Sequence, residues 1–459
     1  MDESLTVLVM AAGRGTRMRS SLPKVLHPLC GLPMLHWVVG AAREAGAERV
    51  LCITRPGDGV LEGLPEGAEC VEQVTGEGTG SAILAAADRV QPGSTVIVLS
   101  GDQPLITPGI LGELLVRHRN QRAAATILTT TQIDPAGYGR IVRAADGRVE
   151  RIIETKHTEG LTEQELRLRE VNLGTYAFEA DALFSTLARV PEIDGERYLT
   201  GVFPLYRDEG LAIAAHQTLD AASAKGVNSR LDLMEVERLA RRRIVEEHAR
   251  AGVIFVLPDT AAIDFGVEIG EETRIEPGVT VRGGCRIGRG CEVGPHTTLI
   301  DAELGDDVRV PHSYLVECTV EDGALVGPFA YLRPGAHLEP GAKVGTFVEV
   351  KNSRLGRGAK VPHLSYIGDT DVGDRANVGA GAITANYDGR RKHRTRIGAG
   401  AKTSVHTAFV APVNVGDGAY TGAGSVITDD VPDGALGIAR ARQTNIEGYA
   451  KRVEEKQGE

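Results

Sequence analysis

The sequence is poor in aromatic residues and contains no long apolar run. Phe, Trp and Tyr make up 4% of its 459 residues, and there is a single Trp. No stretch of about 18 apolar residues occurs, so no membrane-spanning helix is predicted. The first residues, MDESL, carry no basic segment of the kind that begins a secretion signal. We therefore expect a cytoplasmic protein with no membrane partner.

Cysteine pairs and an excess of positive charge are also missing. The six cysteines include no CxxC pair, so neither a zinc ribbon nor a redox dithiol is predicted, and we expect reduced thiols that mostly fill the core. The 51 Lys and Arg residues are outnumbered by 62 Asp and Glu, which gives a net charge of −11. A surface that follows nucleic-acid phosphates needs an excess of cations, so no nucleic-acid partner is expected.

Glycine, by contrast, is abundant, with 57 residues, which indicates many tight turns in a chain long enough for two or more domains. Up to about residue 227, short apolar runs alternate with helical patterns. This alternation predicts a mostly parallel sheet flanked by helices, a Rossmann-like α/β domain. The strand-like runs are VLVM (7–10), RVLCI (49–53) and STVIVLSGD (94–102), and helix-like segments follow Met34, Thr79 and Thr107.

One amphipathic helix is predicted after this domain, over residues 231–251. Its apolar residues fall at helical spacing between charged ones, and Gly252 ends the pattern. The predicted organisation is an α/β domain over 1–227, a linker helix over 228–252 and a second domain over 253–459.

From Ile263 onward, an aliphatic residue recurs every six positions. The register holds to Leu299, resumes from Val320 to Val350, again from Leu355 to 378 with one slip, and last from 397 to 427. This is the hexapeptide signature of a parallel β-helix, in which each hexad forms one flat face and points its aliphatic residue inward. Resemblance to hexapeptide-repeat acyltransferases implies a left-handed coil, against the usual crossover preference.

The stretch VLVMAAGRGTRMRSSLPK (7–24) predicts a strand that ends in a phosphate-binding loop. Gly13 and Gly15 match two of the three glycines of a dinucleotide fingerprint, but Met18 occupies the third position. Arg17 and Lys24 add cations that suit a triphosphate held by backbone N–H groups, whereas a redox cofactor has little use for them. For this loop taken alone, a basic surface turn is the alternative.

The full motif A-A-G-x-G-T-R-M-x-S-x-x-P-K closely resembles that of sugar-1-phosphate nucleotidylyltransferases. With VLHPLCGLPM behind it and the hexads downstream, nearly the whole chain resembles the bacterial bifunctional N-acetylglucosamine-1-phosphate uridyltransferase and glucosamine-1-phosphate acetyltransferase family. The resemblance implies acetyl transfer from acetyl-CoA to glucosamine 1-phosphate, then uridyl transfer from UTP with release of pyrophosphate. The product, UDP-N-acetylglucosamine, feeds peptidoglycan and lipopolysaccharide synthesis. It also implies Mg²⁺ as cofactor and a homotrimer.

The resemblance assigns roles to residues of the first domain. Arg17 would stabilise the departing pyrophosphate, and Lys24 would neutralise the reacting phosphates. Asp102 follows a buried-looking strand, where an unpaired carboxylate is costly, and together with Asn228 it would hold Mg²⁺. An Asn before a helix is also a common N-cap, so Asn228 has two possible roles. The implied nucleotide and sugar positions are Met10, Ala11, Ala12, Gly13, Lys24, Gln73, Gly78, Thr79, Ser100, Gly101, Asp102, Gly139, Glu154, Asn172 and Asn228.

Three positions of this domain depart from the family pattern. Ser81 and His157 replace a usual His and Asp, and Gly201 stands where the family has Asp. None of them is a predicted metal or phosphate contact.

Four segments of the second domain resemble acetyltransferase motifs: AYLRPGAHL, GTFVEVKN, HLSYIGD and NVGAGAITANYDG. The resemblance makes His363 the base that frees the sugar amine, which its ordinary pKa suits. Arg333 and Lys351 would bind the sugar phosphate, and Tyr366 and Asn377 would orient the sugar. The implied acetyl-CoA positions are Ala380, Asn386, Tyr387, Ser404, Val405, Ala423 and Arg440.

One acetyl-CoA contact is open, because the family places Ser at position 405 and this chain has Ser404 followed by Val405. Either a local register shift lets Ser404 serve, or the backbone of Val405 does. The basic run RRKHR (390–394) reads most simply as a solvated loop, with attraction of CoA phosphates as the alternative.

Two other functions remain to be weighed. The β-helix could serve only as an assembly scaffold for a single-activity nucleotidylyltransferase. A zinc enzyme of the carbonic anhydrase kind would need three clustered His ligands. By hexad counting, no common side of the coil is expected for the five histidines His296, His312, His337, His363 and His406.

Overall fold

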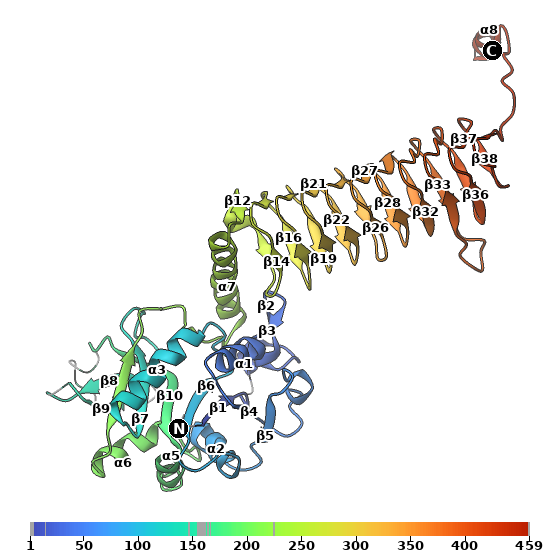
Figure 1. Ribbon diagram of the computed structural model, residues 1–459. Helices are drawn as coiled ribbons and strands as arrows, with labels where there is room; N and C mark the ends of the chain where they lie inside the picture. The colour runs from blue at the N-terminus through green and yellow to red at the C-terminus, as the bar shows by residue number, and fades with distance from the viewer. Residues whose placement is uncertain are drawn as a thin grey trace. The chain divides into compact units, whose positions relative to one another are not determined.

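The computed structural model describes residues 4–13, 15–145, 147–153, 162, 165, 167–223 and 225–457. The chain divides into two compact units, Met1–Arg241 and Arg242–Glu459 (Figure 1). The division falls inside helix α7 (Arg230–Arg250). The sequence-based boundaries, at residues 227 and 252, lie on either side of it.

The first unit contains a mostly parallel sheet, as the alternating sequence pattern predicted. Its strand order is β11–β7–β10–β6–β1–β4–β5, and a small β8–β9 hairpin pairs with β10. Only β10 among the seven runs antiparallel to its neighbours, β6 and β7. The strands are β1 Leu5–Met10, β4 Arg49–Thr54, β5 Glu69–Glu72, β6 Thr95–Ser100, β7 Ala125–Thr130, β8 Arg140–Arg143, β9 Val149–Ile153, β10 Val171–Glu179 and β11 Ile213–Gln217. Another short hairpin joins β2 Pro28–Leu29 to β3 Leu32–Pro33.

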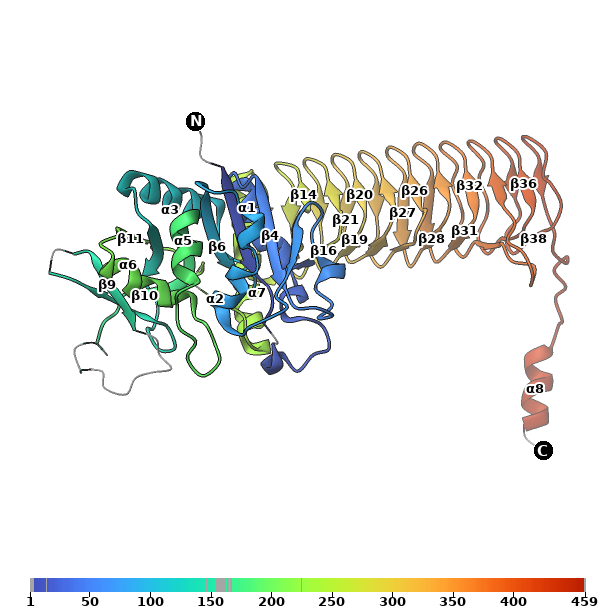
Figure 2. The same ribbon diagram turned by 90° about the horizontal axis from the view of Figure 1, so that it is seen from below.

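Helices cover both faces of this sheet (Figures 1 and 2). Helices α1 (Met34–Glu44) and α3 (Pro108–Gln121) pack into one apolar core. Helices α2 (Gly78–Leu84), α5 (Ala180–Leu187) and α6 (Val202–Asp208) pack into the other. The helices expected after Met34, Thr79 and Thr107 are therefore confirmed, and Thr107 caps α3 by accepting a hydrogen bond of 3.3 Å from the Ile110 amide.

The predicted amphipathic helix is α7. It begins with a capping box, because Asp232 Oδ2 accepts from the Ser229 amide at 2.8 Å and the Asp232 amide donates to Ser229 Oγ at 3.3 Å. Val236, Ala240 and Ile244 are buried, as the helical spacing predicted. Gly252, with φ of 95°, follows the end of the helix.

The second unit is a left-handed parallel β-helix built from three parallel sheets. The first face contains β12 Ile254–Phe255, β15 Arg274–Ile275, β18 Glu292–Val293, β21 Arg309–Val310, β24 Leu325–Val326, β27 Lys343–Thr346 and β30 Lys360–His363. The second face contains β13 Ala262–Ile263, β16 Thr280–Arg282, β19 Thr298–Ile300, β22 Tyr314–Val316, β25 Tyr331–Leu332, β28 Glu349–Lys351, β31 Tyr366–Gly368, β33 Ile383–Ala385, β35 Ala408–Val410 and β38 Val426–Ile427. The third face contains β14 Glu268–Ile269, β17 Arg286–Ile287, β20 Glu303–Leu304, β23 Thr319–Val320, β26 His337–Leu338, β29 Arg354–Leu355, β32 Thr370–Val372, β34 Thr395–Ile397 and β36 Val413–Val415. A last pair is β37 Tyr420–Thr421 with β39 Leu436–Gly437, and α8 covers Tyr449–Gln457.

The hexad residues form the interior of this β-helix. Every predicted inward position from Ile263 to Ile427 is buried except Ile269, which is half-buried. The break in register after Leu299 has a simple cause, because the coils there are shorter. Leu299 pairs with Leu315, and Leu304 with Val320, rather than with residues 18 positions on.

The corner between the first and second faces carries a row of side chains, all exposed except the half-buried His312, that we call the corner ladder: His296, His312, Phe329, Phe347 and Leu364. All five have positive φ angles, between 45° and 58°. Ring centroids lie 5.8 Å apart for His296 and His312, and 5.5 Å apart for Phe329 and Phe347. Phe347 and Leu364 remain 59% and 60% exposed. A row of apolar side chains therefore runs along this edge in contact with solvent.

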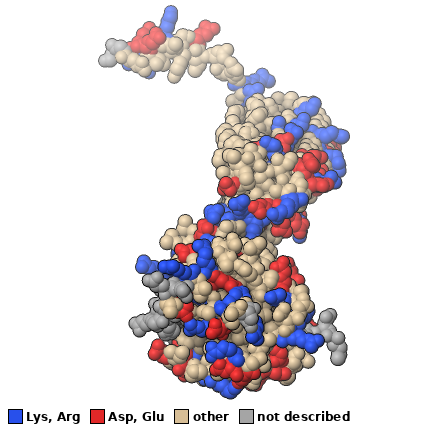
Figure 3. All heavy atoms as spheres, turned by 90° about the vertical axis from the view of Figure 1, so that its left-hand side faces the viewer, with Lys and Arg blue, Asp and Glu red and all other residues tan. Residues whose placement is uncertain are grey.

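No helix among the described residues is long and apolar enough to cross a bilayer. Acidic and basic side chains are interspersed on the face that Figure 3 shows. All six cysteines are free thiols, and all but Cys70 are buried, which confirms the prediction that they mostly fill the core. Burial raises the pKa of Cys52 and of Cys318 to about 12.

Candidate active sites

The first candidate site lies where strands β1, β4, β5 and β6 end. The parallel strands deliver their carboxyl ends to one edge of the sheet, where open α/β sheets place their ligands. A cavity of about 290 Å³ opens there. The predicted site residues that line it are Met10, Ala12, Gly13, Lys24, Gln73, Gly78, Thr79, Ser100 and Asp102.

Lys24 occupies the centre of this cavity wall. Its ammonium pairs with Asp102 Oδ2 and donates a hydrogen bond of 3.1 Å to Asn228 Oδ1. Ser100 Oγ holds the other carboxylate oxygen of Asp102 at 2.8 Å. The two side-chain oxygens predicted to hold a metal, from Asp102 and Asn228, therefore converge on one cation.

The glycine loop folds closely over Lys24. Gly15 has φ of 57°, and a Cβ placed on it would lie 2.7 Å from Lys24 Cβ, so only glycine fits there. Met18, at the third position of the dinucleotide fingerprint, is 1% exposed and packs into the core. The loop thus departs from a dinucleotide site in its packing as well as in its sequence.

Four predicted residues of this region do not line the cavity, and one of them, Asn228, contacts it through its hydrogen bond with Lys24. Arg17 is exposed in a 3₁₀ turn over Thr16–Met18. Ala11 is buried and donates its amide to the Ile53 carbonyl at 2.8 Å, while the Gly101 amide donates to the Met10 carbonyl at 2.9 Å. Ala11 and Gly101 therefore act through the backbone, and a Cβ at Gly101 would lie 3.1 Å from that carbonyl.

Gly139 and Asn172 are brought together beside the cavity rather than in its wall. The Asn172 amide donates to the Gly139 carbonyl at 2.9 Å. The side chain of Asn172 donates to Tyr176 Oη at 2.7 Å and accepts from the Gly174 amide at 3.0 Å. Glu154 and His157 lie outside the described residues.

Segment 73–79, which contains the implied nucleotide positions Gln73, Gly78 and Thr79, is held in place by hydrogen bonds and close packing. Gln73 Nε2 donates to the Gly76 carbonyl at 3.0 Å. A Cβ at Gly78 would lie 2.5 Å from the Arg197 carbonyl oxygen, so this chain requires glycine there. Thr79 Oγ1 accepts a hydrogen bond of 3.0 Å from the Leu199 amide. The segment containing Arg197 and Leu199 therefore packs directly on the start of α2.

Two of the three positions that depart from the family pattern, Ser81 and Gly201, are among the described residues. Ser81 is buried, and its Oγ would lie 2.7 Å from a Cβ added to Gly76. A Cβ added to Gly201 would lie 2.4 Å from Val190 Cγ1. Because Val190 fills the space that an Asp would need, the glycine at position 201 is a packing requirement of this chain.

Sequence reasoning missed three charged residues of the cavity wall, Arg55, Glu77 and Glu196. Arg55 donates to the Ala12 carbonyl at 2.9 Å and pairs with Glu77. The hydrogen bond to Glu77 raises the pKa of Arg55 above its ordinary value. The available signal was the position of Arg55, immediately after a strand that ends at the ligand edge.

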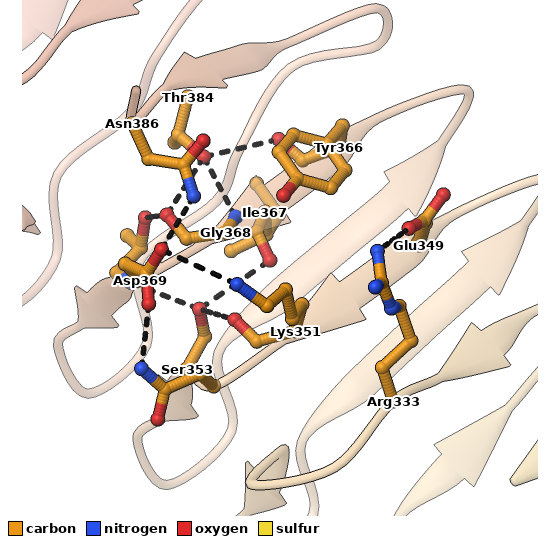
Figure 4. A network of polar contacts seen from close by, with 12 residues as sticks. Arg333, Glu349, Lys351, Ser353, Tyr366, Ile367, Gly368, Asp369, Thr384 and Asn386 are labelled. Atoms are coloured by element: carbon orange, nitrogen blue, oxygen red, sulfur yellow. Dashed lines mark hydrogen bonds and ion pairs between the residues drawn. The ribbon is translucent and has the colours of Figure 1, made fainter. Parts of the chain in front are cut away.

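The second candidate site lies on the second face of the β-helix (Figure 4). Parallel pairing of β25, β28 and β31 sets Glu349 beside Tyr366, and Lys351 beside Gly368. The Arg333 amide donates to the Val350 carbonyl at 2.8 Å, which places Arg333 next to Lys351. Arg333 also donates to Glu349 Oε1 at 2.8 Å. The predicted phosphate ligands and Tyr366 are thus brought together.

Asp369, for which no role was predicted, is the centre of this network (Figure 4). It accepts from Asn352 Nδ2 at 2.5 Å and from Asn386 Nδ2, and its Oδ2 lies 3.7 Å from Lys351 Nζ. Burial raises the pKa of Asp369, but the two hydrogen bonds and the charges of Lys351 and Lys392 outweigh burial and lower it overall. A Cβ at Gly368 would lie 2.5 Å from Tyr366 Oη, so glycine is needed beside this cluster.

The basic run 390–394 is a solvated loop, as predicted, since all its residues but the half-buried His393 are exposed, and a bridge between Tyr387 and Lys392 closes it as a hairpin. Asp388 caps its turn by accepting from the Arg390 and Arg391 amides, each at 2.7 Å. These bonds, together with His393, lower the pKa of Asp388 to about 2. The hairpin brings Lys392 to Lys351, and this like charge lowers the pKa of Lys392.

His363 begins a file of residues along the edge of the corner ladder. The carbonyls of His363, Ala380 and Val405 each accept from the corner amide of the next coil, at 3.2, 2.7 and 2.9 Å. Ala423 follows in the same file, since the last of these amides belongs to Gly424. Val405 keeps this register and Ser404 stacks on Gly379, so there is no local register shift. The imidazole of His363 makes no side-chain hydrogen bond to the described part of the chain.

Other predicted residues are dispersed. The backbone of Asn377 pairs with that of Lys360 and of Lys402 on the first face. Tyr366 belongs to the second face, so the corner lies between Asn377 and Tyr366. Tyr387 is 61% exposed, and Arg440 is exposed after β39. Asn386 is buried against Asp369.

As predicted, the five histidines share no common side of the coil, because His337 belongs to strand β26 of the third face. His296 and His312 do share a side of the coil and stack, because the shorter coils there shift the hexad count. Phe329 comes next in the row, and the described residues contain no group of three potential metal-ligating side chains of His, Cys, Asp or Glu.

Comparison with known proteins agrees with this architecture. The family described as MobA-like NTP transferase domain matches residues 7–168, and bacterial transferase hexapeptide, six repeats, matches residues 266–301. The protein named Bifunctional protein GlmU of Enterococcus faecalis is 43% identical over 98% of this chain and 99% of its own. The protein of the same name from Alkaliphilus metalliredigens is 39% identical over 98% of both chains, and that from Listeria monocytogenes is 43% identical over 97% and 98%.

The fold and the matches define a nucleotidyltransferase domain joined to a hexapeptide-repeat acyltransferase. Because the similarity extends over nearly the whole chain, the chain belongs to the GlmU family of bifunctional proteins. It is a transferase with two activities in UDP-N-acetylglucosamine synthesis, N-acetylglucosamine-1-phosphate uridyltransfer and glucosamine-1-phosphate acetyltransfer. Family membership favours this over a single-activity enzyme with a β-helical scaffold.

Proposed function

We propose that uridyl transfer takes place in the cavity at the edge of the first sheet. The convergence of Asp102 and Asn228 on the Lys24 ammonium carries this proposal, because it shows that these oxygens are arranged around a cation. Lys24 can exchange these partners for phosphate oxygens when a triphosphate enters. Gly13 and Gly15 let the loop backbone approach closely, and catalysis consists mainly of positioning and charge stabilisation.

Mg²⁺ fits the oxygen ligands of Asp102 and Asn228, which suit a hard cation. When bound, the ion would neutralise charge on the reacting phosphates. Arg17, exposed at the loop, would act on the departing pyrophosphate. The sugar phosphate oxygen forms the new bond to the α-phosphorus, the bond to the β-phosphate bridge breaks, and pyrophosphate leaves. Gly139 and Asn172, held together by a backbone hydrogen bond, would contact the sugar, with Glu154 beside them.

Acetyl transfer is assigned to the edge of the corner ladder. His363 would take a proton from the C2 ammonium of glucosamine 1-phosphate, and the freed amine attacks the thioester of acetyl-CoA. A C–N bond forms, the C–S bond breaks, and the CoA thiolate takes up a proton. Arg333 and Lys351 hold the phosphate, and Lys392 adds a third cation. Ala380, Val405 and Ala423 would line the path of the pantetheine arm because each is close to the corner.

A neighbouring subunit completes this second site in our proposal. Tyr366 and Asn377 lie on different faces of one chain, so a second copy must supply one of them if both contact the sugar. The exposed corner ladder offers an apolar row for packing between copies. We propose a homotrimer that works in the cytoplasm, where UTP and acetyl-CoA are available and free thiols persist.

The test supplies glucosamine 1-phosphate, acetyl-CoA, UTP and Mg²⁺, and follows free thiol and pyrophosphate separately. Asp102→Ala is expected to abolish pyrophosphate release while leaving thiol release intact. His363→Ala is expected to abolish thiol release, and it should still release pyrophosphate when N-acetylglucosamine 1-phosphate is supplied directly. Each variant is the folding control of the other. Retained pyrophosphate release by Asp102→Ala refutes the metal assignment, and retained thiol release by His363→Ala refutes the base.

A further inference from the structure

Arg55 connects two walls of the nucleotide cavity that come from distant parts of the chain. It follows strand β4, and its backbone is fixed by a hydrogen bond of 2.8 Å from its amide to Asp58 Oδ2. Its Nε donates to the Ala12 carbonyl at 2.9 Å. Its two terminal nitrogens donate to the carboxylate of Glu77, with Nη1 3.0 Å from Oε1. One side chain therefore makes all three of these contacts.

The two partners, Ala12 and Glu77, belong to the two segments that a bound nucleotide must contact. Ala12 belongs to the phosphate loop, between Met10 and Gly13. Glu77 precedes Gly78 and Thr79 at the start of α2, and its carbonyl is held by the Arg197 amide at 2.9 Å. The separation of these two segments decides whether the phosphates and the base can be bound at the same time.

Only arginine can hold both partners with this geometry. Its planar guanidinium presents donors in fixed directions, so Nε can serve one acceptor while the two terminal nitrogens serve a carboxylate. A lysine ammonium is a single point donor on a flexible stem. It can reach one of the two partners but does not fix their separation.

We propose that Arg55 is a positioning residue of uridyl transfer that sets the distance between the phosphate loop and segment 73–79. This inference rests on the proposed function of the cavity. Glu77 is 48% exposed and Arg55 is 27% exposed. An ion pair this open to solvent adds little to the stability of the fold. The effect of breaking it is therefore expected in nucleotide binding rather than in folding.

The test measures the KM for UTP and the kcat of pyrophosphate release at saturating N-acetylglucosamine 1-phosphate and Mg²⁺. Arg55→Met is expected to raise the KM for UTP by about tenfold to a hundredfold, as loss of charge-assisted hydrogen bonds does. The kcat and the KM for the sugar phosphate should stay within about twofold. Arg55→Lys should restore part of the loss, and Glu77→Gln should fall between Arg55→Lys and wild type.

Arg49→Met is the matched control. Arg49 begins the same strand and pairs with Glu69 in the same two-bond manner, at 2.8 and 2.7 Å, but does not line the cavity. Its loss should leave the KM for UTP unchanged. Adding Glu77→Gln to Arg55→Met should cause no further loss, because the pair is already broken.

An unchanged KM for UTP in Arg55→Met, an equal rise in Arg49→Met, or additive effects of Arg55→Met and Glu77→Gln would overturn the proposal. If Arg55→Met does not fold, as judged by its thiol release, Arg55→Lys alone decides: wild-type KM then contradicts the inference. Failure of the cavity assignment itself is recognised separately, by pyrophosphate release that survives Asp102→Ala.

Discussion

Asn352 donates a hydrogen bond of 2.5 Å to the carboxylate of Asp369, and both residues are in left-handed backbone conformations, with φ of 43° and 50°. The same carboxylate holds Asn386 and attracts Lys351. A buried acid that receives this many donors keeps its charge because it is surrounded by them. It can then fix the direction of Lys351 within the second candidate site.

Asp369→Asn tests this role. Removing the charge should raise the KM for glucosamine 1-phosphate by about tenfold or more, because the charge-assisted hydrogen bond from Asn386 and the ion pair with Lys351 are weakened. Thiol release measures the effect, and pyrophosphate release from preformed N-acetylglucosamine 1-phosphate should not change. Asp371→Asn is the control, since Asp371 only pairs with the exposed Arg394. Equal KM values for the two variants would contradict a positioning role for Asp369.

Asn228 and Ser229 are adjacent, but we expect only Asn228 to act in uridyl transfer and only Ser229 to cap helix α7. Ser229→Ala removes a capping box and should cost about 1 kcal/mol in the free energy of unfolding, with pyrophosphate release retained. Asn228→Ala should leave stability nearly unchanged and should raise the Mg²⁺ concentration needed for half-maximal pyrophosphate release. Denaturant melts and Mg²⁺ titrations check the pair. A Ser229→Ala enzyme that needs more Mg²⁺ would contradict this division of roles.

The stability of the first unit should fall in mild acid because of His27. Burial, and then the charge of Arg230 3.3 Å away, lower the pKa of His27. The unfolded chain therefore binds this proton more readily than the folded one, so stability rises with pH between the folded and unfolded pKa values. The contribution is complete above about pH 6.5 and is lost as pH drops below that value. Urea midpoints of wild type should fall between pH 7.5 and 5.5.

His27→Gln should reduce that fall, because the titrating group is gone. Arg230→Met should reduce it as well, since the charge that opposes protonation has been removed. Parallel pH curves for wild type and both variants would show that other groups govern the acid response.

Gly201 offers a test of packing that uses a compensating change. Gly201→Asp should lower the free energy of unfolding by about 1–3 kcal/mol, because the new Cβ overlaps Val190 Cγ1. The same substitution in a Val190→Ala background should cost less, as expected for residues in contact. Thermal melts of the four proteins give the coupling. If the two effects simply add, the glycine has another cause.

The hexads show what a sequence can determine. Their inward positions depend only on local periodicity, so one chain is enough to predict them, and nearly all are buried as expected. The sequence shows where the register breaks but not the length of the coils there. A coil of 16 or 17 residues is recognised only from the residues that it pairs with in the next coil. The contact between the rings of His296 and His312 could not be predicted for the same reason.

The residues of the first site were likewise predicted only in part. The loop motif pointed to Lys24, and the strand-like run 94–102 pointed to Asp102; the two side chains do meet in the cavity. Arg55 and Glu77 were missed because their significance comes from a contact across the sheet edge that no local spacing encodes. Asp369 was quoted within a motif, yet its role depends on Asn352 and Asn386, in the coils on either side of it.

Four evenly spaced positions follow one edge of the β-helix: His363, Ala380, Val405 and Ala423. Successive coils are about 4.8 Å apart, so these four positions mark out about 14 Å along the corner in equal steps. If acetyl-CoA binds along this file, as proposed, the length of the carrier would matter as well as its chemistry. A coil inserted between His363 and Ala423 would keep every local contact and displace the far end of the carrier by one step. Selection for the donor would then act on the number of coils.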